Sequence, residues 1–158
     1  YRTTDGGETW LKTLGDDEWT GVTEVVIDPR NPDVLYAATW QRHRTVAAYL
    51  GGGPGSGLHR STDGGETWVE LTTGLPESNM GKIGLAVSPQ KPDIVYAAIE
   101  LDRNRGGIYR SSDRGSSWEK VSDTVLQDGK YQSAFGQTPF KEPIDTPDDS
   151  YLTAVPLN

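Results

Sequence analysis

The loop-like stretch from Trp40 to Ser56, with the sequence WQRHRTVAAYLGGGPGS, concentrates side chains that can bind a ligand. Aromatic faces can stack on a sugar ring, and guanidinium groups bind carboxylates through two parallel hydrogen bonds. The predicted ligand-binding residues for a protein or glycan ligand are therefore the aromatic, arginine and histidine residues of this stretch: Trp40, Arg42, His43, Arg44 and Tyr49.

The alternative for the same stretch is a structural role. Trp40 and Tyr49 would pack the loop onto its scaffold, and the cations would balance nearby acids such as Asp16, Asp17 and Glu18. The glycine run of residues 51–57 does not predict a phosphate-binding loop, because it lacks G-K-[S/T] and precedes a strand pattern instead of a helix.

Metal and cofactor chemistry has little support in the sequence. The chain has no cysteine, only two histidines (His43 and His59, sixteen positions apart) and no DxDxDG-type loop. No metal site and no cofactor are therefore predicted. The net charge of −8 without a Lys/Arg cluster argues against nucleic acid as a partner, and the lack of a long apolar run argues against membrane insertion.

A phrase of the form [S/T]-x-D-x-G-x-[S/T]-W occurs three times and organises the chain. The copies are TTDGGETW, STDGGETW and SSDRGSSW, at Thr3–Trp10 (box 1), Ser61–Trp68 (box 2) and Ser111–Trp118 (box 3). In each copy an Asp can accept backbone N–H bonds inside a tight turn, a Gly can adopt positive φ, and the Trp needs an apolar environment. The predicted structural residues are Asp5, Gly7, Trp10, Asp63, Gly65, Trp68, Asp113, Gly115 and Trp118, and we expect the three tryptophans to be largely buried.

A second repeated segment lies between the boxes. VVIDPRNPDVLYAA at Val25–Ala38 aligns with LAVSPQKPDIVYAA at Leu85–Ala98. Alternating apolar residues between Pro, Asp and Gly turns predict four short strands in each of two repeats. The predicted strands are 22–27, 34–39, 58–62 and 67–71, then 83–87, 94–99, 108–112 and 117–121.

Four antiparallel strands per repeat of this length are typical of a β-propeller blade. With its three boxes the chain resembles Asp-box (bacterial neuraminidase repeat) propellers, and most of all bacterial sortilin-like propeller proteins. The predicted fold is thus all-β, a partial propeller of four-stranded antiparallel blades with Asp-box turns. The resemblance implies an extracellular or periplasmic location.

The repeats divide the chain into four predicted parts. Residues 1–19 end a truncated blade, 20–75 form a complete blade with the long loop 40–56, 76–122 form a second blade, and 123–158 are a Pro/Asp-rich tail. The tail holds four of the ten prolines and is expected to be poorly ordered. Because propellers take typically four to eight blades, further blades of a longer chain are the expected partners.

The predicted function is a non-catalytic binding or assembly module within a larger sortilin-like repeat protein. The alternative is a fragment of a glycoside hydrolase of the sialidase or xyloglucanase type. For the xyloglucanase type the resemblance would place catalytic Asp residues on the loop side, where Asp16, Asp17 and Asp102 are candidates, but no motif marks them, so no catalytic residue is assigned. The sialidase R-I-P motif does not occur.

Turn order gives one further expectation. In an antiparallel meander successive turns alternate between the two ends of the sheet. The Asp-box turns and the turn at 28–33 should therefore share one end of a blade, and the loop 40–56 should lie at the other end, where loops vary between repeats and specificity usually resides.

Overall fold

The computed structural model describes residues 1–132 except 16, 102–105, 124 and 128–129. Within that part it contains strands and no helix. The first sheet, blade 1, has the order β1-β2-β5-β6 and comprises β1 (Thr20–Asp28), β2 (Asn31–Gln41), β5 (Gly57–Ser61) and β6 (Val69–Leu71). The second sheet, blade 2, has the order β10-β9-β8-β7 and comprises β7 (Ile83–Val87), β8 (Val95–Ile99), β9 (Gly107–Ser111) and β10 (Glu119–Asp123).

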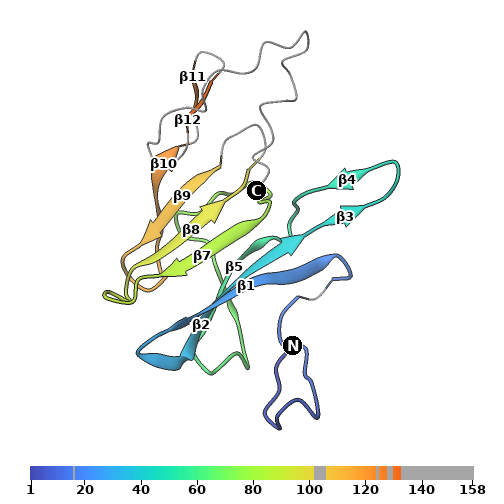
Figure 1. The fold of residues 1–158 in the computed structure, drawn as a ribbon, viewed down its shortest axis with the longest axis vertical. Coiled ribbons are helices and arrows are strands. Elements are labelled where there is room, and N and C mark those ends of the chain that lie inside the picture. The colour runs from blue at the N-terminus through green and yellow to red at the C-terminus, as the bar shows by residue number, and fades with distance from the viewer. Residues whose placement is uncertain (16, 102–105, 124, 128–129, 133–158) are drawn as a thin grey trace.

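Both sheets are antiparallel meanders that lie side by side (Figure 1). This confirms the predicted fold class, a partial propeller of four-stranded antiparallel blades. Two short hairpins complete the strands: β3 (His43–Arg44) with β4 (Tyr49–Leu50), and β11 (Val125–Gln127) with β12 (Lys130–Gln132). The sequence did not predict the second hairpin, and the rest of the predicted tail, 133–158, lies outside the described residues.

The main core fills the space between the two blades. Period-two alternation directs one set of blade 1 side chains toward blade 2, among them the fully buried Tyr36 and Leu58. They meet the buried Ile83, Leu85 and Val95 of blade 2 in one hydrophobic cluster. Glu24 of β1 crosses the same interface and accepts a hydrogen bond from the backbone N–H of Leu85 at 2.8 Å.

Each box is a hydrogen-bonded turn built around its aspartate (Asp5, Asp63 and Asp113, the box aspartates). In box 2 the Asp63 carboxylate accepts bonds from the Ser61 hydroxyl at 2.7 Å and from the N–H of Thr67 at 3.0 Å. Gly65 follows at φ 84°, and its N–H donates to the Ser61 hydroxyl at 2.8 Å. The donors stabilise the charged carboxylate, so they lower the pKa of every box aspartate, that of Asp113 to about 2.

The expectation that all three box tryptophans are largely buried is wrong for Trp10. Trp118 is 6% exposed, Trp68 is half-buried, and Trp10 is 61% exposed. The physical reason is that each tryptophan packs against the segment leaving the preceding blade. Trp118 donates its backbone N–H to the Thr73 carbonyl, and Trp68 donates its indole N–H to Thr13.

That reason also explains Trp10. Among the residues that the structure describes, no segment equivalent to Thr73 lies beside Trp10, and its indole N–H bonds to the Gly7 carbonyl of its own turn, at 3.1 Å. The burial of a box tryptophan is thus a property of two adjacent blades and not of the box alone.

An arginine precedes each box, and the arginines before boxes 1 and 2 link neighbouring blades. Arg2 donates to the Gly64 carbonyl of box 2 at 2.9 Å, and Arg60 donates to the equivalent carbonyl of box 3, that of Arg114, at 2.8 Å. The third equivalent arginine, Arg110, pairs with Glu119 on the adjacent strand at 3.0 Å. We call the two bonds between blades the arginine clasps.

The turns alternate between the ends of the sheets. In blade 1 the box residue Gly64 donates its N–H to the carbonyl of Asp33 at 2.9 Å, and in blade 2 Arg114 donates to Asp93 at 3.0 Å. The boxes and the β1–β2 and β7–β8 turns therefore share one end of each blade, the box end. Loop 40–56 leaves β2 at the opposite end, the loop end, as the meander requires.

Candidate binding site

The predicted ligand-binding residues lie on an exposed arm at the loop end. After β2 the chain forms the β3–β4 hairpin, which projects away from the two sheets (Figure 1). His43 pairs with Leu50 and Arg44 with Tyr49, and Thr45 closes the turn by accepting N–H bonds from Ala47 and Ala48. Tyr49 is 61% exposed, so the arm offers its side chains to solvent.

Four of the five predicted residues form two cation–π pairs. The Arg42 guanidinium lies 5.3 Å from the centroid of the Trp40 ring, and that of Arg44 lies 6.0 Å from the centroid of Tyr49. Trp40 is fixed at the base of the arm by a 2.8 Å bond from its indole N–H to the Gly51 carbonyl. The aromatic faces therefore hold the guanidinium groups in place while their N–H edges stay available.

His43 is separate from these pairs. Its ring stacks on Trp19 with a centroid distance of 4.0 Å, and Trp19 also accepts the backbone N–H of Arg42 at 3.0 Å. Sequence reasoning missed Trp19, because it lies 24 residues upstream and only the folded blade brings it to the arm. The structural alternative for loop 40–56 thus fits His43, which docks the arm, better than it fits the arginines.

The glycine run allows the loop to lie close to its neighbours. A Cβ on Gly52 would lie 2.5 Å from the carbonyl oxygen of Met80, and one on Gly53 or Gly55 would overlap the Gln41 or Thr20 side chain. A bridge between Gly53 and Met80 joins the loop to the segment that leads into blade 2. The glycines therefore seat the arm across the junction of the blades.

Two adjoining pockets open at this junction. The first has a volume of about 530 Å³ and is lined by Gly51, Gly52, Ser78, Asn79, Gly81, Glu100 and Leu101. The second, of about 400 Å³, shares Ser78 and Asn79 and adds Glu70 and Glu77. Hydroxyl, amide and carboxylate groups in a pocket of this size suit a polar, multiply hydroxylated ligand.

Glu100 is held in the first pocket by its position at the end of β8. Its carboxylate accepts the N–H of Lys82 at 3.2 Å, and its backbone bonds to Gly81 and Lys82. A hydrogen-bond acceptor is thereby fixed at the pocket wall.

The predicted catalytic candidates receive little support. Asp16 and Asp102 lie outside the described residues. Asp17 accepts bonds from the Trp19 N–H and the Thr20 hydroxyl, and these bonds lower the pKa of its carboxyl, chiefly that from Thr20. A carboxylate with a lowered pKa just before β1 is better suited to closing that turn than to donating a proton.

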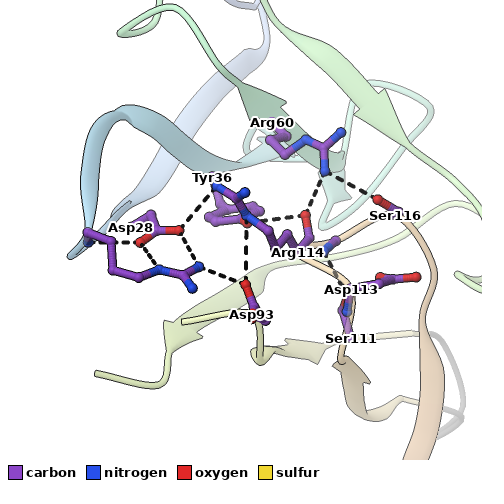
Figure 2. A network of polar contacts seen from close by, with 10 residues as sticks. Asp28, Tyr36, Arg60, Asp93, Ser111, Asp113, Arg114 and Ser116 are labelled. Atoms are coloured by element: carbon purple, nitrogen blue, oxygen red, sulfur yellow. Dashed lines mark hydrogen bonds and ion pairs between the residues drawn. The ribbon is translucent and has the colours of Figure 1, made fainter. Parts of the chain in front are cut away.

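The most connected polar network lies at the other end, the box end, and was not predicted (Figure 2). Asp28, whose side chain is fully buried, pairs with Arg30 at 3.0 Å and with Arg114 at 3.4 Å, and Arg30 also reaches Asp93 at 2.7 Å. These arginine contacts lower the pKa of Asp28 and Asp93. Because the network joins the β1–β2 turn to box 3, its role is to lock blade 1 to blade 2.

Arg114 explains why sequence reasoning missed this network. It occupies the position of Gly6 and Gly64, with φ 61°, where the repeat otherwise uses glycine. The deviation SSDRGSSW was visible as a signal, but its partner Asp28 is 86 residues away.

Metal binding and membrane insertion receive no structural support in the described ranges. There, no group of three or more His, Cys, Asp or Glu residues is arranged to hold an ion, and no helix is long and apolar enough to cross a membrane. Burial lowers the pKa of His59, the second histidine.

Comparison with known proteins identifies the family. The model of the Sortilin-Vps10 family, described as "Sortilin, neurotensin receptor 3", matches residues 1–144. The chain belongs to the Sortilin-Vps10 family. The predicted resemblance to sortilin-like propellers is therefore confirmed.

Curated relatives of this Sortilin-Vps10 chain include xyloglucanases. A xyloglucanase of Paenibacillus sp is 30% identical over 150 residues, which covers 81% of the chain and 13% of that enzyme. Xyloglucanase Xgh74A of Acetivibrio thermocellus is 31% identical over 132 residues, which covers 77% of the chain and 15% of the enzyme. The chain thus spans only about one seventh of the length of these relatives.

A solved structure of an ancestral GH74 enzyme also matches. Its TM-score is 0.49 at 20% identity, and the match covers 68% of the chain and 14% of that structure.

Proposed function

We propose that this chain supplies part of the saccharide-binding face of a β-propeller glycoside hydrolase that acts on a xyloglucan-type polysaccharide. The observation that carries the proposal is the 30% and 31% identity to two xyloglucanases over about four fifths of the chain. It favours the glycoside hydrolase alternative over a non-catalytic assembly module.

The loop end supports the same proposal. Its larger pocket of about 530 Å³ is lined by groups that can bond to sugar hydroxyls, and it lies where loops differ between the two blades. The box end, by contrast, has nearly the same turn in each repeat, and its charged side chains pair with one another in the Asp28 network.

Hydrolysis of a glycosidic bond requires a pair of catalytic carboxyl groups, and the described residues of the loop end do not identify one. Most glycosidases need a proton-donating carboxylic acid and a second carboxylate. Among the described candidates Asp17 has a lowered pKa, and Glu100 stands at the pocket wall as a substrate-binding acceptor. We therefore propose substrate contacts for the described loop end and assign no catalytic pair there.

The proposal is tested by titrating ¹⁵N-labelled protein with a neutral xyloglucan oligosaccharide and following amide chemical shifts. Shifts should concentrate at Gly51, Gly52, Ser78, Asn79 and Gly81, and the amides of Gly64 and Gly115 in the boxes should not move. Shifts confined to the box end, or no binding, would overturn the proposal.

A matched pair of variants sharpens the test. Glu100→Gln should weaken binding about fivefold, the equivalent of about 1 kcal/mol for one hydrogen bond. Glu119→Gln removes the same charge on β10, away from the pocket lining, and should leave the affinity unchanged.

The second candidate, a non-catalytic binding module, is favoured by the match of the Sortilin-Vps10 family model to residues 1–144. Mass spectrometry of the oligosaccharide after incubation with the full-length protein separates the two. Shortened products support the hydrolase, and binding without cleavage supports the module.

A further inference from the structure

We propose that Arg42 and Arg44 form an anionic subsite beside the loop-end pocket, which binds carboxylates of a uronic-acid-bearing saccharide. The inference rests on the proposed function and extends it from neutral glucans to acidic ones.

The first argument is the arrangement of the two arginines. They are two residues apart, with Arg42 between β2 and β3 and Arg44 at the end of β3. Arg42 lies over Trp40 and Arg44 over Tyr49, whereas the intervening His43 turns to Trp19. Each guanidinium group therefore lies against an aromatic ring of the same arm.

The second argument is the lack of internal partners. Elsewhere in the described part of the chain arginines are bonded to other residues, as Arg2 is to Glu66, Arg110 to Glu119 and Arg114 to Asp28. Within that same part, Arg42 and Arg44 are exposed and neither forms an ion pair. Because no carboxylate of the described residues pairs with these guanidinium groups, they are available to bind carboxylates of a ligand.

The third argument is charge complementarity. The chain carries a net charge of −8, so its field repels anions over most of the surface. The arm concentrates cations instead, so the local electrostatic potential there attracts a carboxylate that the rest of the surface repels.

The fourth argument places the arginines at the edge of the pocket. Trp40 bonds to the Gly51 carbonyl, and Tyr49 lies against Gly51, since a Cβ on that glycine would be 2.8 Å from the Tyr49 ring. Gly51 itself lines the 530 Å³ pocket. A sugar seated in the pocket would direct a neighbouring uronate toward Arg42 and Arg44.

The pocket lining favours a saccharide over an acidic peptide. It consists mostly of glycine, serine, asparagine and glutamate, and Leu101 is its one large apolar residue in the described lining. Hydroxyl-bearing rings satisfy such a lining better than the apolar anchors of a peptide do.

The test compares two probes that differ only in charge. Isothermal titration calorimetry measures the binding of a xyloglucan oligosaccharide with one glucuronic acid branch and of the same oligosaccharide with a neutral glucose in that branch, at about 50 and about 200 mM salt. We expect the acidic probe to bind at least about tenfold more tightly at low salt, and this ratio to shrink at high salt.

Variants decide whether the arm is responsible. Arg42→Gln/Arg44→Gln should bring the affinity ratio close to one, and Arg42→Lys/Arg44→Lys should retain an intermediate ratio, because charge remains and the planar fork is lost. Arg110→Gln removes a partly buried cation on β9, outside the arm, and should keep the wild-type ratio. Circular dichroism confirms that each variant is folded.

The possible failures are distinguishable. Equal affinity for both probes, or a preference that persists in the double Gln variant, would overturn the subsite. Tighter binding of a hexaglutamate peptide than of the acidic sugar would overturn the saccharide assignment. The neutral xyloglucan titration described above reports separately on the proposed function.

Discussion

Replacing equivalent tryptophans of the three boxes should have unequal costs, although the boxes are nearly identical in sequence. Trp118 is 6% exposed and packs with Leu71 and Leu75, whereas Trp10 is 61% exposed. An aromatic residue of this size buries about 200 Å², so Trp118 removes about 190 Å² from water and Trp10 about 80 Å². At about 25 cal/mol per Å² these areas correspond to about 5 and about 2 kcal/mol.

Trp118→Ala loses this burial and also leaves a cavity, so we expect it to lower the free energy of unfolding by about 3 to 5 kcal/mol. Trp10→Ala leaves no cavity and should lower it by at most about 2 kcal/mol. Trp68→Ala, at a half-buried site, should fall between them. Urea unfolding followed by circular dichroism gives the free energy of unfolding of each variant.

The reasoning would be refuted if Trp10→Ala and Trp118→Ala lowered the free energy of unfolding equally. That result would mean that the box itself, and not the adjacent blade, provides the environment of its tryptophan.

Three further predictions concern stability. Tyr36→Phe should cost about 1 kcal/mol in urea unfolding, because the hydroxyl loses its 3.1 Å bond to the Arg114 carbonyl, which keeps its bond from Arg60; no change would mean that this bond contributes nothing. Gly74→Ala should lower the thermal midpoint, because the position has φ 80° and its Cβ would overlap the Trp118 backbone; Gly6→Ala, with φ 74° and open space, is the control and should shift it less. The box aspartates have a pKa lowered by folding, so their stabilisation is complete above the unfolded value of about 4 and should be lost as the pH falls toward about 2, whereas a flat acid titration of stability would contradict this.

The sequence predicted the strands well where the signal was local. Ile83–Val87 is strictly alternating and is bounded by turns, and its observed limits coincide with the predicted ones. The Asp-box turns were equally predictable, because the hydrogen bonds that close each turn around its aspartate join residues at most four positions apart.

Features that depend on two blades were not predictable in the same way. The exposure of Trp10, the stacking of Trp19 on His43 and the pairing of Asp28 with Arg114 all depend on which segments become neighbours in space. The candidate site shows the same division: its arginines were visible in the sequence, but the pocket beside them combines residues 51–52, 78–81 and 100–101, which only the junction of the blades brings together.

The arginine clasps have a consequence for how the protein folds. Each clasp runs from the strand before one box to the carbonyl of the next box, so a box is completed only when its predecessor is already in place. The free energy of folding of such an array is the sum of the intrinsic stability of each repeat and the interaction energies between adjacent repeats. Within the two described blades, amide hydrogen exchange should therefore be slowest at the junction of β1 and β7, where each blade is stabilised by its neighbour, and faster in the strands farther from it.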